Sequence, residues 1–464
     1  MPQTSSSLLR SDLLITAAFG IIATLAVLSG CRKSQPASET VPPSSAAASA
    51  TDVPATAGPA TAGPDATAGP DDPADVAALR DAGYVLETND AGNVVSLSVS
   101  SDTSIADSLP HLSGVPHVQV AVFNGPGVTD EGMSAIETLE KLKRLTLNDS
   151  AISDATLESV GKLANIEALF LRRTGVTGEG LAHLTSLKKL RAIDLRNTNI
   201  ADPGMDSLAK IESLEDIQLE KSKITDAGVA KLAGLSLKSF NANYCTSISN
   251  RSLEVLGNMK SLRSIQLDYT MIDDEGMPAI EGLTELRRLR IRGADVTGEG
   301  LKSIAGLKSL QRMELRDTSV DDEGIQIISE LPQINYLDIS ECRLVSPEGL
   351  QQIGKLTELV FLGLWETKLD DDALNTYGDL SKLTELNLMS TKVSDESLET
   401  LLKLTNLERL NAAGTRFSDD GFRQIATLPK LKYLNVANTD ISYETIDALA
   451  ESHQELKIAE SEHE

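Results

Sequence analysis

The chain has 464 residues, with 68 acidic against 42 basic side chains and a net charge of −26 at pH 7. This negative charge argues against a nucleic-acid partner, because the phosphate backbone would be repelled. The five histidines show no metal-ligand spacing, so neither a metal site nor a cofactor is expected.

The first 30 residues are interpreted as a lipoprotein signal peptide. An apolar run covers residues 13–28, which is shorter than the roughly 20 residues that a membrane span needs. It leads into the tetrapeptide LSGC, ending at Cys31, which resembles the bacterial lipobox. The resemblance implies that Cys31 is lipidated on its thiol and anchors the chain in the cell envelope. In the lipoproteins that this segment resembles, an aspartate after the cysteine is the signal for retention in the inner membrane. Arg32 follows Cys31 here, so the resemblance favours the outer membrane, with the face left open.

The residues before this run leave an alternative open. Only Arg10 supplies positive charge there, and Asp12 lies beside it. An uncleaved anchor or an ordinary signal peptide would also fit these residues.

Residues 31–72 are predicted to be an extended, disordered tether rich in proline, alanine, serine and threonine, with the motif ATAGP three times. Such a spacer would let a lipid-anchored domain stand off the membrane, and a linker without a selected length fits the composition equally. Residues 73–93 are predicted to form an N-terminal cap, with a helix over 75–82, a strand from Tyr84 and a turn.

From residue 94 to 455 the chain repeats one unit of about 24 residues, about 15 times over. In the copy 383–404 leucines first alternate, as in a strand, and then recur every third residue, as in a short helix. One unit cannot bury its own apolar side, so the copies must stack. The opening apolar position recurs at Val118, Leu142, Ile166, Leu190, Leu214, Leu237, Leu262, Leu286, Leu310, Ile334, Leu359, Leu383, Leu407 and Leu431.

The pattern L-x-x-L-x-L-x-x-T-x-[IV]-[ST]-D-x-G-L-x-x-L-x-x-L resembles the leucine-rich repeat family. The ninth position carries mostly Thr, with Cys245, Cys342, two serines and Ala294, and resembles the Thr/Cys variant of bacterial repeat proteins and of eukaryotic F-box proteins. The resemblance covers residues 94–458. It implies an α/β solenoid, or horseshoe, with a parallel β-sheet on the concave face and short helices on the convex face. Residues 456–464 should form the C-terminal cap and tail, with Tyr443 and Leu449 covering the last repeat.

Two recurring features are interpreted as structural. The ninth-position hydroxyls should satisfy backbone groups at a buried bend, and Cys245 and Cys342 in that column lie about 19 Å apart, too far for a disulfide. Aspartates at helix starts could suggest calcium, but capping and the helix dipole explain them: Asp130, Asp154, Asp202, Asp226, Asp274, Asp322 and Asp395.

The residues between the leucines should line the concave face, where aromatic and arginine side chains gather. Such anchors and cations are typical of a site for an anionic group or an acidic partner surface. The alternative is a solvated charge ladder, because the register places Glu314 beside Arg290 and Asp268 beside Arg292. The candidate ligand-binding residues are Arg288, Arg290, Arg292, Arg312, Arg316, Tyr269, Tyr336, Phe361 and Trp365.

The resemblance implies a non-enzymatic protein-recognition or scaffold module, here tethered through a lipid on Cys31, with a protein partner of unknown identity. Binding of a glycan or an anionic surface polymer near Trp365 and Arg316 is an alternative. A ubiquitin-ligase adaptor, as among F-box relatives, would need an F-box that residues 32–93 are too poor in apolar content to supply. An enzyme is not expected, since no nucleophile–base or metal grouping is present. The oligomeric state is left open.

Overall fold

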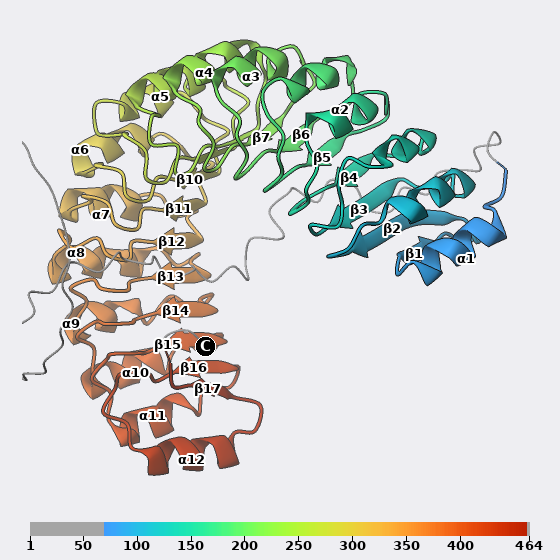
Figure 1. Cartoon of the computed structure of the whole chain (residues 1–464). Coiled ribbons are helices and arrows are strands. Elements are labelled where there is room, and N and C mark those ends of the chain that lie inside the picture. Colours follow the sequence, from blue (N-terminus) through green and yellow to red (C-terminus); the bar gives the residue numbers. More distant parts are fainter. Residues whose placement is uncertain (1–68, 462–464) are drawn as a thin grey trace, which may run out of the picture. The chain divides into compact units, whose positions relative to one another are not determined.

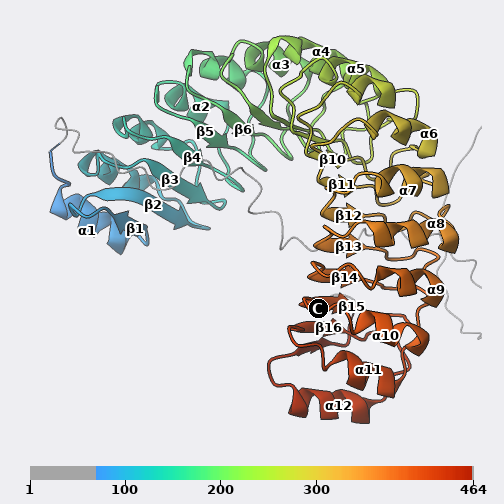
Figure 2. The ribbon, with the colours of Figure 1, turned by 180° about the vertical axis from the view of Figure 1, so that it is seen from behind.

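The structure is a computed structural model that describes residues 69–461. The predicted signal peptide, Cys31 and all but the last four residues of the predicted tether lie outside the described residues. Within 69–461, strands and short helices alternate as a stack of similar units (Figure 1). The strands line the concave side and the helices the convex side, as the view from behind also shows (Figure 2). This is the predicted α/β solenoid.

The strands are three to seven residues long, and most have three. They are β1 (Val85–Thr88), β2 (Val94–Ser100), β3 (Val120–Asn124), β4 (Arg144–Thr146), β5 (Ala168–Phe170), β6 (Ala192–Asp194), β7 (Asp216–Gln218), β8 (Ser239–Asn241), β9 (Ser264–Gln266), β10 (Arg288–Arg290), β11 (Arg312–Glu314), β12 (Tyr336–Asp338), β13 (Phe361–Gly363), β14 (Glu385–Asn387), β15 (Arg409–Asn411), β16 (Tyr433–Asn435) and β17 (Lys457–Ala459).

The helices lie between the strands. The α-helices are α1 (Pro73–Asp81), α2 (Asp154–Val160), α3 (Asp202–Leu208), α4 (Asp226–Lys231), α5 (Asn250–Leu256), α6 (Gly298–Leu301), α7 (Asp322–Ser329), α8 (Pro347–Gln351), α9 (Asp371–Leu374), α10 (Leu398–Leu401), α11 (Asp419–Ile425) and α12 (Tyr443–Ser452). The 3₁₀ helices are η1 (Ala106–Gly114), η2 (Met133–Thr138), η3 (Gly180–Ser186), η4 (Leu232–Gly234), η5 (Met277–Ile280), η6 (Lys302–Ile304), η7 (Gln352–Lys355), η8 (Asn375–Tyr377) and η9 (Asp395–Ser397).

All 17 described strands belong to one sheet. β1 pairs with β2 in antiparallel orientation, and from β2 onward each strand pairs in parallel with the next along the chain. The register keeps equivalent positions side by side, so that Leu289 lies opposite Ile265 on one side and Met313 on the other. Each column of the repeat therefore becomes a row across the sheet.

One continuous core runs through the stack. The first, fourth and sixth positions of a copy are fully buried, as Leu286, Leu289 and Ile291 illustrate. The ninth-position hydroxyl turns back to the carbonyl three residues earlier, with 2.6 Å from Thr391 Oγ1 to the oxygen of Leu388. This confirms that small polar residues satisfy the buried bend.

The two cysteines of the ninth column are buried and form no disulfide with each other, as predicted. Their Sγ atoms donate to backbone oxygens of the preceding copy, from Cys245 to Leu219 and from Cys342 to Leu315, at 3.2 Å in each case. Their thiols therefore connect two copies, whereas the Thr391 hydroxyl donates within its own copy.

The helix-start aspartates connect one copy to the next. Asp226 Oδ1 accepts from the backbone N–H of Ser249 at 2.8 Å, and Oδ2 accepts from the Ser249 hydroxyl at 2.6 Å. Ser249 is itself the N-cap of α5. Burial raises the pKa of Asp226, but the hydrogen bonds from Ser249 and Ser252 outweigh it and lower the pKa overall. The hydrogen bonds of the predicted capping therefore order the helix start of the following copy, while Asp226 also lies in the first turn of its own helix, α4, as the helix-dipole part of the prediction expects.

The N-terminal segment is fastened to the first copies before the sheet begins. Asp72 caps α1, and its own N–H donates to the oxygen of Gly114 at 2.8 Å. The Asp71 carboxylate accepts from the N–H of Val94, and the carboxylate of Asp75 lies 2.7 Å from His111 Nδ1. Residues 69–72, at the end of the predicted tether, thus contact the folded unit.

At the other end, α12 and β17 follow the last full copy. Leu449 and Leu456 are buried, whereas the Tyr443 side chain is 80% exposed. Tyr443 was expected to cover the last repeat, and this expectation is wrong because the residue opens α12 at its first, solvent-facing turn. None of the helices formed by residues 69–461 is both long and apolar enough for a membrane span.

Candidate functional site

The concave face presents the third, fifth and seventh positions of every copy as three rows, with the eighth position beside them. In the fourteen copies from 118 to 431 these positions carry eleven basic and eleven acidic side chains. This balance sets the face apart from a chain whose net charge is −26. The basic ones are Arg144, Arg172, Arg173, Arg196, Lys221, Arg288, Arg290, Arg292, Arg312, Arg316 and Arg409; the acidic ones are Asp149, Asp194, Asp216, Glu220, Asp268, Glu314, Asp317, Asp338, Glu341, Glu366 and Glu385.

Many fifth-position residues have a structural task that the sequence analysis missed. Each strand is short, so the N–H of the seventh residue lies past the end of the hydrogen-bonded strand. The side chain at the fifth position accepts from it, with 3.1 Å from Ala413 N to Asn411 Oδ1. The signal was present in the sequence as a recurring Asn or Asp in this column: Asp194, Asn241, Asp338, Asn387, Asn411 and Asn435.

The predicted arginines of β10 and β11 form a network around two buried carboxylates. Glu314 lies 2.8 Å from Arg288 Nη2 and 2.7 Å from Arg312 Nε. Asp268 lies 2.6 Å from Arg290 Nη2. The Glu314 and Asp268 side chains are 5% and 0% exposed.

The electrostatics of this network differ from those of a solvated ladder. Burial raises the pKa of Glu314, and the charges of Arg288, Arg290 and Arg312 outweigh that effect, so that its pKa falls to about 2. The neighbours predicted from the register are present, but the pairs are buried, because the arginine side chains cover the acids. Each of the two carboxylates contacts more than one guanidinium group.

The predicted aromatic residues fall into two groups. On β12 and β13 the rings of Tyr336 and Phe361 stack, with centroids 4.0 Å apart and planes 6° from parallel. The guanidinium of Arg316 lies 4.2 Å from the centroid of the Trp365 ring. Trp365 is the seventh residue of the copy in which Phe361 is the third. Tyr269 lies apart from them and stacks on Tyr244 at 5.1 Å.

The eighth position has left-handed backbone in all fourteen copies. Three of these residues are glycine: Gly125, Gly293 and Gly414. The other eleven carry side chains in a conformation that such residues seldom adopt. They are Asp149, Arg173, Asn197, Lys221, Tyr244, Tyr269, Asp317, Glu341, Glu366, Ser390 and Asn438.

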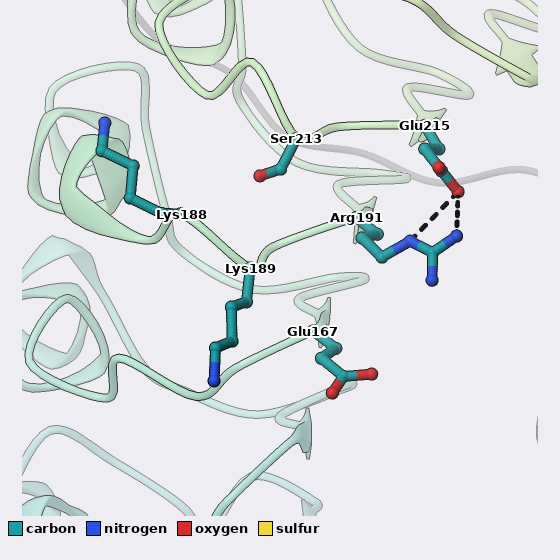
Figure 3. A pocket seen from close by; sticks show the side chains of 6 residues that line it. All are labelled: Glu167, Lys188, Lys189, Arg191, Ser213 and Glu215. Carbon is teal, nitrogen blue, oxygen red and sulfur yellow. Dashed lines mark hydrogen bonds and ion pairs between the residues drawn. The ribbon is translucent and has the colours of Figure 1, made fainter.

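A shallow hollow of about 370 Å³ lies at the amino ends of the strands near β6, away from the arginine network (Figure 3). Its wall contains an ion pair of 2.6 Å between Arg191 Nη2 and Glu215 Oε2. Lys188 and Lys189 extend in different directions from it, and Lys189 donates to Asn165. The polar groups do not converge on one point, so the hollow gives no indication of a catalytic arrangement. Across residues 69–461, His, Cys, Asp and Glu side chains form no cluster suited to a metal ion.

Comparison with protein-family models matches a leucine-rich repeat region over residues 94–342 and a further leucine-rich repeat over residues 379–402. Comparison with curated proteins gave no match.

Several solved structures resemble the chain. An internalin of Listeria monocytogenes is 20% identical over 73% of this chain and 94% of its own, with a TM-score of 0.52. A leucine-rich repeat protein of Leptospira interrogans is 17% identical over 77% of this chain and 92% of its own, with a TM-score of 0.49. The leucine-rich repeat ectodomain of the receptor kinase GASSHO1/SCHENGEN3 of Arabidopsis thaliana is 15% identical over 82% of this chain and 51% of its own, with a TM-score of 0.47. At these identities the likeness to the internalin concerns the fold alone.

Proposed function

Because the chain belongs to the leucine-rich repeat family, we propose that it is a non-enzymatic recognition module whose concave face binds a protein partner. One observation carries this proposal: stacked rings and guanidinium groups lie on a sheet face that no other described element covers. Aromatic and arginine side chains supply much of the binding energy at protein interfaces. The convex face, by contrast, consists of helices that already cover the core.

We propose further that a lipid on Cys31 holds this module at the cell envelope, at the outer membrane. The support is the LSGC sequence after the apolar run and the composition of the segment that follows. Between Cys31 and Gly69 lie residues 32–68, a stretch of 37 residues whose composition is typical of a spacer. That length would separate the recognition face from the lipid surface.

Replacing the lipid-bearing thiol tests the anchor. In the Cys31→Ser variant we expect the protein to move from the membrane fraction to the soluble fraction, because the proposed lipid can no longer be attached. Fractionation followed by immunoblotting measures this, with Cys245→Ser as the control, because that thiol is buried in the core. Retention of the Cys31→Ser variant in membranes would contradict the proposed lipid anchor.

Steric blocking tests the concave face. Single cysteines introduced by Ala168→Cys, Ala192→Cys or Met389→Cys at partly exposed concave positions of the full chain, and by Ala230→Cys on the exposed side of α4, would each carry a bulky maleimide polymer. The native Cys245 and Cys342 are buried and should stay unlabelled. We expect cross-linking in envelope extracts to capture a protein that at least one concave label excludes and the α4 label does not.

Two other outcomes would overturn the proposal. A partner excluded only by the label on α4 would place recognition on the convex face. Capture of a purified envelope polysaccharide, and of no protein, would favour the glycan alternative.

A further inference from the structure

Between β11 and β14 the side chains on the concave face change from mainly basic to aromatic and acidic. Five side chains in this part of the face form what we name the acidic–aromatic patch: Tyr336, Asp338, Phe361, Trp365 and Glu385. Tyr336, Phe361 and Glu385 are direct neighbours in the third-position row of three adjacent strands. Asp338 lies in the fifth-position row beside Gly363.

Gly363 leaves open the space that the Asp338 carboxylate occupies. A Cβ atom at residue 363 would lie 2.6 Å from Asp338 Oδ1 and 3.2 Å from the Ser340 hydroxyl. Any side chain there would therefore displace the carboxylate. The glycine thus leaves room for this carboxylate at the position between Phe361 and Trp365 of its own copy.

The carboxylates of this patch are neutralised less than those of the arginine network. Glu314 and Asp268 each contact guanidinium groups within 2.8 Å. Asp338 accepts from the N–H of Ser340, and within residues 69–461 no cation lies close enough to form an ion pair with it. Glu385 has its ion-pair partner, Arg409 Nε, only at 3.9 Å.

The position of Arg409 explains that long distance. Its guanidinium lies 4.2 Å above the ring of Tyr433, on the side away from Phe361. Burial raises the pKa of Asp338, and it also raises the pKa of the half-exposed Glu385, where the charge of Arg409 offsets only part of the cost of burial. A cation supplied from outside would offset that cost.

The protein itself shows how a cation binds on this face. Guanidinium groups lie over aromatic rings at four places, at 3.8 to 4.4 Å from the centroids: Arg144 on Phe170, Arg312 on Tyr336, Arg316 on Trp365 and Arg409 on Tyr433. Arg316 also donates to Glu341 at 2.7 Å, so that one cation contacts a ring and a carboxylate together. Such contacts gain strength where water is displaced.

Phe361 and Glu385 form a ring and a carboxylate side by side in the same way. Tyr336 covers one face of the Phe361 ring, and Glu385 is the next residue along the row on the other side. We propose that the acidic–aromatic patch binds an arginine or lysine side chain of an extended partner segment, with the cation between the Phe361 ring and Glu385 and within the field of Asp338. This inference rests on the proposed function that the concave face binds protein. It assigns a ligand charge opposite to the one that the arginine cluster suggested.

A displayed library of random decapeptides, panned on the full chain in detergent, tests this inference. We expect the enriched peptides to share an arginine or lysine. Replacing that residue in a synthetic copy by citrulline or norleucine should weaken binding about tenfold or more. The double variant Asp338→Asn, Glu385→Gln should weaken the unmodified peptide similarly, and Glu399→Gln on the convex side should not.

The outcomes separate this inference from the proposed function. Peptides that the concave polymer labels exclude, but that bind equally without a basic residue, would overturn the cationic ligand and leave concave recognition standing. Panning that yields no peptide sensitive to the concave labels would count against concave recognition itself. Should the double variant fail to give the circular dichroism of the parent chain, the citrulline comparison still decides the question.

Discussion

Deleting residues 383–394 is expected to unfold the C-terminal part of the stack, whereas deleting residues 383–406 is expected to leave it folded. The shorter deletion removes 12 residues and the longer one 24. In a solenoid each unit contacts only its neighbours. The effect of a deletion on stability therefore depends mainly on whether the remaining repeats still align with one another. The larger cut should therefore do less damage.

The contacts show why the longer deletion is tolerated. It joins Lys382 to Leu407, so that β13 meets β15 in the register it had with β14. Asp371, which accepts from the N–H and hydroxyl of Ser394, would find the equivalent Ser418. Strand pairing and the inter-copy hydrogen bonds are both preserved.

The shorter deletion brings Asp395 to the opening leucine position and Lys403 to the ninth. Both positions are buried in the intact stack, and an unpaired charge there is strongly unfavourable. Limited proteolysis with mass spectrometry measures the result: cleavage throughout residues 395–461 for the 12-residue deletion, and a pattern like that of the parent chain for the 24-residue deletion. Equal resistance of the two variants would show that stacking does not depend on this register.

The Glu314→Gln variant is expected to lose about 3–5 kcal/mol of unfolding free energy, the range found when one partner of a buried ion pair is removed. The change is almost isosteric, so packing is kept. It leaves the guanidinium groups of Arg288, Arg290 and Arg312 close together without their shared carboxylate. Urea unfolding followed by circular dichroism measures the loss.

Glu366→Gln is the matched control. Glu366 pairs with Arg343 at 2.8 Å, but their side chains are 38% and 65% exposed, so removing this pair should cost less than about 1 kcal/mol. An unfolding midpoint of Glu314→Gln equal to that of the control would mean that the network is solvated after all.

The same carboxylate should make stability depend on pH. The folded-state pKa of Glu314 is about 2, below its ordinary value of 4.5. Its contribution is therefore complete above about pH 4.5 and is lost as the pH falls toward 2, amounting to about 3 kcal/mol at 1.36 kcal/mol for each pKa unit. The Glu314→Gln variant should lack this part of the acid sensitivity of the parent chain.

The sequence predicted the parts of the structure that depend on spacing alone. Buried Leu286 and the pairing of Arg290 with Glu314 both follow from a repeat of fixed length stacked in parallel. The degree of burial of Glu314 did not follow from spacing. It depends on the conformations of three long arginine side chains, which have many rotamers and are selected by their neighbours.

Other misses have a common physical origin in contacts between copies. Asp226 bonds to Ser249, 23 residues along the chain, whereas a helix-start motif in the sequence is usually interpreted within one helix. The arginines are countable in the sequence, but which carboxylates they neutralise, and that Asp338 has no ion pair among residues 69–461, depends on side-chain placement.

The left-handed column at the eighth position has a consequence for engineering and for divergence of the repeat. A non-glycine residue there costs roughly 1–2 kcal/mol in backbone energy, and eleven of the fourteen copies accept that cost. A glycine would relax the backbone at each of these places, as Gly293 already does, but it would remove a side chain such as Tyr269 or Glu341 from the edge of the concave face. At the eighth position of each copy, a residue that favours backbone stability therefore reduces the variety of side chains on the surface. A consensus repeat built for thermal stability would place glycine there and would have a smoother, less discriminating surface.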